Sequence, residues 1–132
     1  MKIQLATVIV DDQDKALKFY TEVLGFMKKA EMPIGGSTWV TVASPDAPES
    51  IELALEPSGF LPSKAYQKSL FEAGSPAISI ATDDFQAEYE RLKALGVTFR
   101  GELSSAEPMT STLFEDTCGN LIRLYRATDS PV

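Results

Sequence analysis

Two stretches of the chain repeat one pattern of apolar and polar positions. The first is VDDQDKALKFYTEVLGF, residues 10–26, and the second is TDDFQAEYERLKALGV, residues 82–97. Each reads as the end of a strand, a pair of aspartates, an amphipathic helix and a glycine. At a fixed offset of 71 residues, Asp12 aligns with Asp83. A pattern written twice in one short chain predicts two copies of one supersecondary module.

The spacing of apolar residues predicts one helix in each repeat, over about residues 13–24 and 85–95. In the first helix the apolar residues recur every three or four positions and form one stripe: Ala16, Leu17, Tyr20, Val23 and Leu24. The aspartates before each helix are suited to cap it, and Gly25 and Gly96 are suited to end it. Phe19 cannot share so narrow a stripe with its neighbour Tyr20, so we expect Phe19 to pack at the edge of the stripe or against a partner chain.

Segments rich in β-branched and alternating residues predict eight strands. They fall at residues 3–10, 26–32, 37–43, 51–56, 77–81, 97–102, 109–115 and 121–126. Turn-forming residues separate the later strands of each half: PIGG at 33–36, SPDAPES at 44–50, a loop at 103–108 and DTCGN at 116–120. Each half of the chain therefore reads β-α-β-β-β.

The predicted modules span residues 1–57 and 76–127 and are joined by residues 58–75. The length of 132 residues favours a single domain, 1–132. The joining segment contains a predicted helix, Ser63–Ala73, whose role has two interpretations. It is either a solvated helix docked by its aromatic residues, Tyr66 and Phe71, or a lid over a cleft.

Composition narrows the classes of function. Apolar residues make up 44% of the chain and charged residues 23%, as in soluble globular proteins. No apolar run approaches the roughly 18 residues of a membrane span. The start of the chain is too short and too strand-like for a signal peptide. A single cysteine cannot form an internal disulfide, which predicts a cytoplasmic protein.

The net charge of −7 argues against nucleic-acid binding. It suits solubility and is compatible with a cationic ligand.

The chain contains no histidine, which removes several kinds of active site. Ser-His-Asp and Cys-His arrangements are excluded, and so is the commonest transition-metal ligand. Acid–base chemistry would rest on carboxylate, tyrosine, lysine or cysteine side chains. Cys118 lies in a predicted turn, where we expect it to be exposed and open to modification. With no histidine to activate its thiol, it is not a catalytic candidate.

Three motifs resemble those of the vicinal oxygen chelate superfamily: DDQDKALKFYTEVLGF, ALGVTF and FEDTCGNLIRLY. This superfamily contains glyoxalase I, the bleomycin-resistance proteins and the extradiol dioxygenases. The resemblance covers essentially the whole chain. It implies an α+β fold in which two βαβββ modules form a curled, open-barrel cleft, often completed by dimerisation. A homodimer is therefore expected.

The resemblance also bears on metal binding. The family takes one metal ligand from the first and one from the last strand of each half, usually His or Gln, Glu, His and Glu. These positions fall on Leu5, Glu52, Ala77 and Arg123. Only Glu52 is retained, and the charge of the arginine would oppose a bound cation. We therefore expect neither a metal nor another cofactor in this member of the family.

Glu52 and Arg123 are separated by the same offset of 71 residues and are expected to face each other inside the cleft. In one interpretation they form an ion pair in place of the lost metal. In the other they are catalytic: Glu52 accepts a proton and Arg123 grips a carboxylate or enolate oxygen. Trp39 is either a core residue or a wall on which a flat ligand stacks. The candidate ligand-binding residues are Trp39, Thr41, Tyr66, Thr7, Ser79 and Tyr125.

Three functions remain open. The favoured one is metal-independent binding of a small organic ligand, as bleomycin-resistance relatives do by sequestration. The second is a lyase or isomerase of the glyoxalase type with Glu52 as base. The third is an accessory protein whose cleft is closed by the Glu52–Arg123 pair. Ordinary glyoxalase I activity and extradiol cleavage are disfavoured, because both use metal ligands that this sequence lacks.

Overall fold

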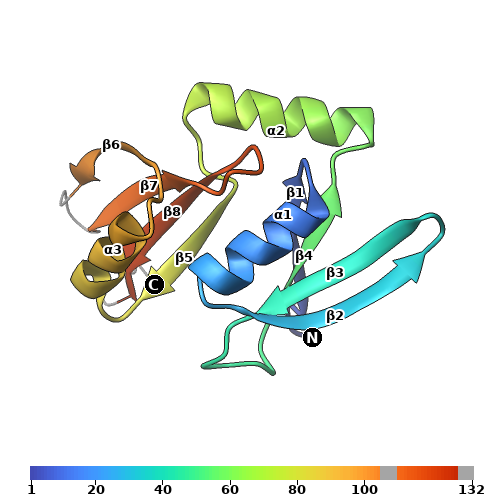
Figure 1. The fold of residues 1–132 in the computed structure, drawn as a ribbon, viewed down its shortest axis with the longest axis horizontal. Helices are drawn as coiled ribbons and strands as arrows, with labels where there is room; N and C mark the ends of the chain where they lie inside the picture. The colour runs from blue at the N-terminus through green and yellow to red at the C-terminus, as the bar shows by residue number, and fades with distance from the viewer. Residues whose placement is uncertain (105–109, 128–132) are drawn as a thin grey trace. The chain divides into compact units, whose positions relative to one another are not determined.

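The chain folds into two βαβββ units, and Figure 1 shows their elements. The structure, a computed structural model, describes residues 1–104 and 110–127. The elements in chain order are β1 (Leu5–Val10), α1 (Gln13–Lys18), η1 (Phe19–Val23), β2 (Met27–Ile34), β3 (Ser37–Ala43), β4 (Glu52–Pro57), α2 (Leu61–Ala73), β5 (Ile78–Thr82), α3 (Phe85–Ala94), β6 (Phe99–Ser104), β7 (Ser111–Glu115) and β8 (Leu121–Arg126). The predicted α+β fold of two β-α-β-β-β modules is confirmed.

The chain divides into two compact units, residues 1–67 and 68–132, called here the N-terminal and C-terminal units. Each holds a four-stranded mixed sheet, with strand orders β1-β4-β3-β2 and β5-β8-β7-β6. In both sheets the first strand pairs with the last in parallel, and the remaining neighbours are antiparallel. A parallel pair cannot be joined by a hairpin, so the helix and two strands of each unit form the connection.

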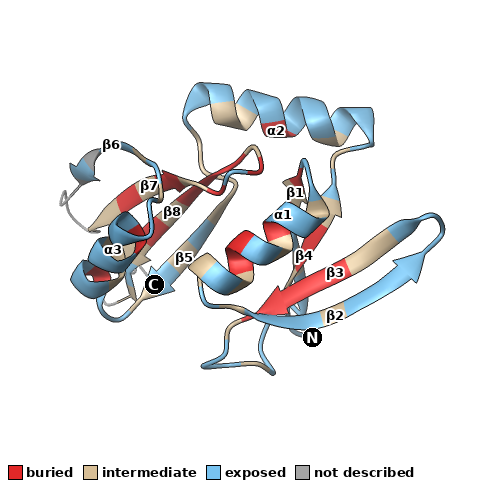
Figure 2. Cartoon of the chain, viewed as in Figure 1, coloured by how far each residue is buried: buried red, intermediate tan, exposed pale blue. Residues whose placement is uncertain are grey.

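The core of the N-terminal unit lies between α1 and one face of its sheet (Figure 2). The buried side chains from both sides of this layer are Val8, Val10, Ala16, Phe19, Tyr20, Val40, Val42 and Leu55. Gln13 fixes the start of α1 to the sheet, because its side-chain amide donates to the carbonyl oxygens of Thr38 and Leu55, each at 2.8 Å. The helix therefore covers only this one face.

The core of the C-terminal unit repeats the arrangement. Phe85 and Leu92 of α3 are buried, as are Phe114, Ile122 and Leu124 of the sheet. Aromatic rings continue this layer: Phe85 and Tyr89 stack, Tyr89 contacts Phe99, and Phe99 meets Phe114 edge to face.

Aspartates cap both repeated helices, as predicted. Asp12 accepts from the backbone N–H of Lys15 at 3.0 Å, and Asp84 accepts from that of Ala87 at 3.1 Å. These caps are 72 residues apart, whereas the glycines that end the two helices are 71 apart. The alignment at one fixed offset, which paired Asp12 with Asp83, is therefore wrong at the helix start. The first unit carries one extra residue between cap and glycine.

A π-helical turn, η1, accommodates this extra residue. The N–H of Leu24 donates to the carbonyl of Phe19, five residues back, instead of four. The wider turn also explains why Phe19 and Tyr20 are both buried, with their rings edge to face at 5.8 Å. The expectation that Phe19 lies at the edge of the stripe or against a partner chain is thus wrong.

Several boundaries differ from the predicted ones. Strand β2 runs past Pro33 to Ile34, and Gly35 and Gly36 make the turn with φ of 50° and 79°. Proline is tolerated there because β2 is an edge strand. Strand β6 extends to Ser104, so the predicted loop at 103–108 begins later. Residues 105–109, including the predicted strand start at Met109, lie outside the described residues.

The helix between the units is confirmed, but it begins at Leu61. Tyr66 is exposed, so it does not dock this helix as one interpretation required. Gln67 is buried instead, and its amide donates to the carbonyl of Ile9 at 2.8 Å. The interpretation of this helix as a lid stays a prediction. Within the described residues, no helix is long and apolar enough to cross a membrane.

Asp116, Cys118 and Asn120 of the turn at residues 116–120 are buried, which corrects the expectation for Cys118. The carboxylate of Asp116 accepts from the backbone N–H groups of Cys118 and Asn120, at 2.8 and 3.0 Å, and from the side-chain amide of Asn120 at 2.8 Å. This network folds the turn inward, and the thiol of Cys118 is fully buried. Gly119 adopts a positive φ of 96°, as predicted.

Substitution of Asp116 by alanine is expected to destabilise the protein strongly. The change leaves buried N–H donors without an acceptor, which costs roughly 2–4 kcal/mol of the free energy of unfolding. Urea unfolding followed by circular dichroism measures the loss. Asp46→Ala, at an exposed loop position, is the matched control and should change the stability by less than about 0.5 kcal/mol. Equal stability of the two variants would contradict the role of Asp116.

Cys118 is expected to resist thiol reagents in the folded protein. Because its sulfur is buried, labelling with an aromatic disulfide reagent should proceed only as fast as the turn opens. The same reagent should react at once in urea. Rapid stoichiometric labelling of the native protein would show that the turn is not packed as described.

Candidate ligand-binding site

The N-terminal sheet has one face that α1 does not cover, called here the N-terminal open face. Side chains alternate between the two faces of a strand, so strand register identifies its members. Thr7 of β1 and Thr41 of β3 both pair with Ala54 of β4. Glu52 lies two positions from Ala54 on β4, and Trp39 lies two positions from Thr41 on β3. The predicted residues Thr7, Trp39, Thr41 and Glu52 therefore share this face.

Glu52 is oriented by a hydrogen bond from its neighbour. The hydroxyl of Thr41 donates to Oε1 of Glu52 at 2.7 Å. Thr41 is buried and Glu52 is half-buried, so the bond is shielded from water. On its other side, Glu52 pairs with Leu5 of β1, whose apolar side chain is exposed. A carboxylate with one free oxygen thus lies beside an apolar surface.

Strand β2 adds further apolar side chains to this face. Met27, Met32 and Ile34 pair with residues of β3 that belong to the open face, and their exposed fractions are 40%, 49% and 53%. A bulge between Lys28 and Ala30 restores the alternation, because one extra residue shifts the phase of the strand. Without it, Met27 would point to the opposite face from the other two.

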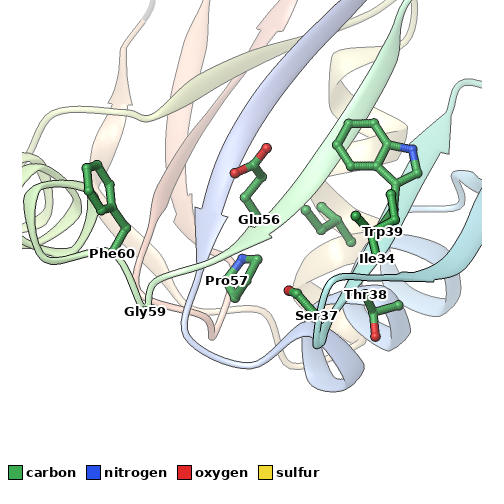
Figure 3. A pocket seen from close by; sticks show the side chains of 9 residues that line it. Ile34, Ser37, Thr38, Trp39, Glu56, Pro57, Gly59 and Phe60 are labelled. Atoms are coloured by element: carbon green, nitrogen blue, oxygen red, sulfur yellow. The ribbon is translucent and has the colours of Figure 1, made fainter.

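A hollow of about 300 Å³ lies at one end of the N-terminal sheet (Figure 3). It is lined by Ile34, Ser37, Thr38, Trp39, Leu55, Glu56, Pro57, Gly59 and Phe60. In Figure 3 the carboxylate of Glu56 lies between the ring of Phe60 and the indole of Trp39. Within this lining the only charged side chain is that of Glu56. The hollow therefore combines two aromatic walls with one negative charge.

Sequence reasoning missed Glu56 and Phe60. Glu56 lies four positions after Glu52 in an alternating strand, a spacing that places both carboxylates on one face. Phe60 is 67% exposed in the segment after β4, where an aromatic residue has no core to join. Both signals are present in the sequence, but only the folded chain brings Phe60 to the end of the sheet.

The C-terminal sheet also has a face that its helix, α3, does not cover, called here the C-terminal open face. Arg123 of β8 is half-buried on this face and pairs with Ser79 of β5 and Leu113 of β7. Tyr125 lies two positions further on the same face. The predicted residues Ser79, Arg123 and Tyr125 are thus neighbours. That Glu52 and Arg123 face each other stays a prediction.

The family's metal-binding positions do not fit a cation here. On the N-terminal sheet, Glu52 lies beside Leu5, which offers no donor atom. On the C-terminal sheet, Ala77 precedes β5, and Arg123 brings a positive charge. Within residues 1–104 and 110–127, no three acidic, cysteine or histidine side chains come together. One carboxylate, two aliphatic side chains and a guanidinium do not form a transition-metal site.

Comparison with known proteins places this chain in a family. Residues 2–124 match the model described as Glyoxalase/Bleomycin resistance protein/Dioxygenase superfamily. The uncharacterized protein YurT of Bacillus subtilis (strain 168) is 48% identical over 126 residues, which cover 96% of this chain and 99% of YurT.

Two solved structures share both sequence and fold with this chain. UcmS2 is 32% identical with a TM-score of 0.82, and the match covers 98% of each chain. TnmS3, described as an antibiotic binding protein from Streptomyces sp. CB03234, is 29% identical with a TM-score of 0.76, over 96% of this chain and 95% of TnmS3. The match to the family model over most of the sequence, supported by these relatives, shows that the chain belongs to the glyoxalase/bleomycin resistance protein/dioxygenase superfamily.

Proposed function

We propose that this protein binds a small organic ligand on the N-terminal open face without the help of a metal. The observation that carries the proposal is the composition of that face. Exposed apolar side chains from β1 and β2 surround two carboxylates, Glu52 and Glu56, and a hollow opens at the end of the sheet. Apolar surface gathered around a concave site is typical of a ligand-binding region.

The lining of the hollow defines the class of ligand. Trp39 and Phe60 offer flat apolar surfaces, which favour a planar or aromatic group. Glu56 is a hydrogen-bond acceptor with a negative charge, which favours an amine or another cationic group on that ligand. The net charge of −7 would add a weak long-range attraction for such a molecule.

The comparisons support binding over metal-dependent catalysis. TnmS3, a relative of the same fold and length, is described as an antibiotic binding protein. In this chain the positions that would hold the catalytic metal carry Leu5, Ala77 and Arg123, so a metal-stabilised enediolate has no support here. Binding of a small organic molecule is the function that these two observations favour.

A lyase or isomerase is the second candidate. The bond from Thr41 fixes one oxygen of Glu52 and leaves the other free to accept a proton, which favours a role as general base. Arg123 is the candidate group to stabilise the oxyanion formed on the substrate. Thr7, Tyr66, Ser79 and Tyr125 stay candidate ligand contacts. We further infer a cytoplasmic protein, because one cysteine cannot form an internal disulfide, and a homodimer, as the family resemblance implies.

Flat cationic aromatic compounds are expected to stabilise the protein and to quench its fluorescence. Trp39 is the only tryptophan, so its emission reports on the hollow directly. Glu56→Gln should weaken such binding by about tenfold or more, because a charge-assisted bond contributes roughly 1.5–3 kcal/mol. Thermal shift and fluorescence titration give the dissociation constants of the wild type and of Glu56→Gln.

The matched control is Glu49→Gln, which removes the same charge from a side chain that is 93% exposed in a loop. It should leave the affinity unchanged within about twofold, because a distant exposed charge is screened. Neutral analogues of the same shape should bind equally to both variants. If the Glu49 and Glu56 variants lost the same affinity, the effect would come from net charge alone. The hollow would then not be the binding site.

Glu52→Gln separates a binder from an enzyme. For a binder, chromatography should recover the ligand unchanged from the wild type and the variant, with only a modest change in affinity. For a lyase or isomerase, the wild type should convert the ligand, and the variant should bind it with a loss of roughly 100-fold or more in turnover. Full turnover by the variant would exclude Glu52 as the base.

A further inference from the structure

We propose that the C-terminal open face holds an oxyanion-binding site centred on Arg123, suited to a small organic acid. This inference deepens the role that the second candidate function gives to Arg123, and it differs from the favoured binding function because it concerns the other unit and a ligand of opposite charge. It requires neither turnover nor a contact between the two units. Three features of the C-terminal sheet support it: the location of Arg123, the pairing of its neighbour Arg100, and the surrounding hydroxyl groups.

Arg123 lies on β8, an inner strand of the sheet, between Ser79 of β5 and Leu113 of β7. It is half-buried, so its charge is less hydrated than that of a surface arginine. A partly desolvated guanidinium favours an anionic partner more strongly than an exposed one does. Among the described residues of its own unit, no carboxylate lies within ion-pair distance of Arg123.

Arg100 shows how a neighbouring arginine on the same face is neutralised. It lies on β6, on the other side of Leu113 from Arg123. Its Nε donates to Oε2 of Glu115 at 2.6 Å, and its guanidinium lies over the ring of Phe71 at 4.9 Å. Arg100 is therefore already paired by this carboxylate and ring, whereas the donors of Arg123 are left for a ligand.

Hydroxyl groups flank Arg123 on the same face. Ser79 is its direct cross-strand neighbour, Tyr125 lies two positions along β8, and Ser111 of β7 pairs with Tyr125. These side chains can donate to an anion but carry no charge of their own. The planar fork of an arginine matches the two oxygens of a carboxylate or a phosphate. Arg123 and these hydroxyl groups together have the chemistry of an oxyanion site.

The test is a titration of 15N-labelled protein, followed through the Nε–Hε signals of its four arginines. The probes are benzoate, phenyl phosphate and benzamidine. Benzoate is expected to shift the Arg123 signal saturably, with a dissociation constant on the order of millimolar for so small a molecule. Phenyl phosphate distinguishes a phosphate from a carboxylate preference. Benzamidine, a cation of similar shape, should leave the Arg123 signal in place.

Two variants complete the experiment. Arg123→Gln should weaken benzoate binding by roughly tenfold or more, and Arg123→Lys should retain part of it, because lysine keeps the charge but loses the fork. Arg126→Gln, the same charge change three residues along β8, should have no effect. The proposal is overturned if the Arg123 signal does not move, if all arginines shift alike, or if Arg123→Gln binds benzoate as tightly as the wild type.

Discussion

The parallel pairing between the first and last strand of each unit is the constraint from which the rest of the structure follows. Parallel neighbours need a long connection, so a helix and two strands must lie between them in the chain. In each unit the helix buries one face of the sheet, and the opposite face is left for function. The same pairing sets Glu52 beside Leu5 and Arg123 beside Ser79.

The two open faces are chemically different although the units share one topology. The N-terminal face carries Glu52 and Glu56 among exposed apolar side chains, whereas the C-terminal face carries Arg123 among hydroxyl groups. Duplication supplies two equivalent surfaces, and substitution on them changes the ligand chemistry without changing the core. A polar group on an open face costs little stability, because water or a ligand can satisfy it.

Small irregularities adjust the repeated unit without breaking it. The π turn η1 takes up one extra residue and brings Phe19 into the core. The bulge between Lys28 and Ala30 keeps the exposed apolar side chains of β2 on one face. Both irregularities change only the local phase of an element, so the strand order and the caps are the same in each unit. Such local changes let a duplicated scaffold acquire different surfaces.

The sequence by itself determined the order of elements, the pairs of aspartates that supply the two helix caps, and membership of the family. These depend on local periodicity and on motifs, which are readable without distant contacts. It also identified Glu52, Trp39 and Thr41 as candidate site residues, and alternation alone placed Trp39 and Thr41 on one face of their strand. The loss of the metal positions was likewise readable from the motifs.

Only the tertiary structure decided the features that depend on residues far apart in the chain. The burial of Cys118 follows from the bonds of Asp116, and the hollow exists because the segment carrying Phe60 returns to the end of the sheet. The β5 neighbour of Arg123 is Ser79, a pairing that no motif gave, because register is set by packing across strands. Local patterns fix which way a side chain points, whereas only long-range packing fixes what it meets.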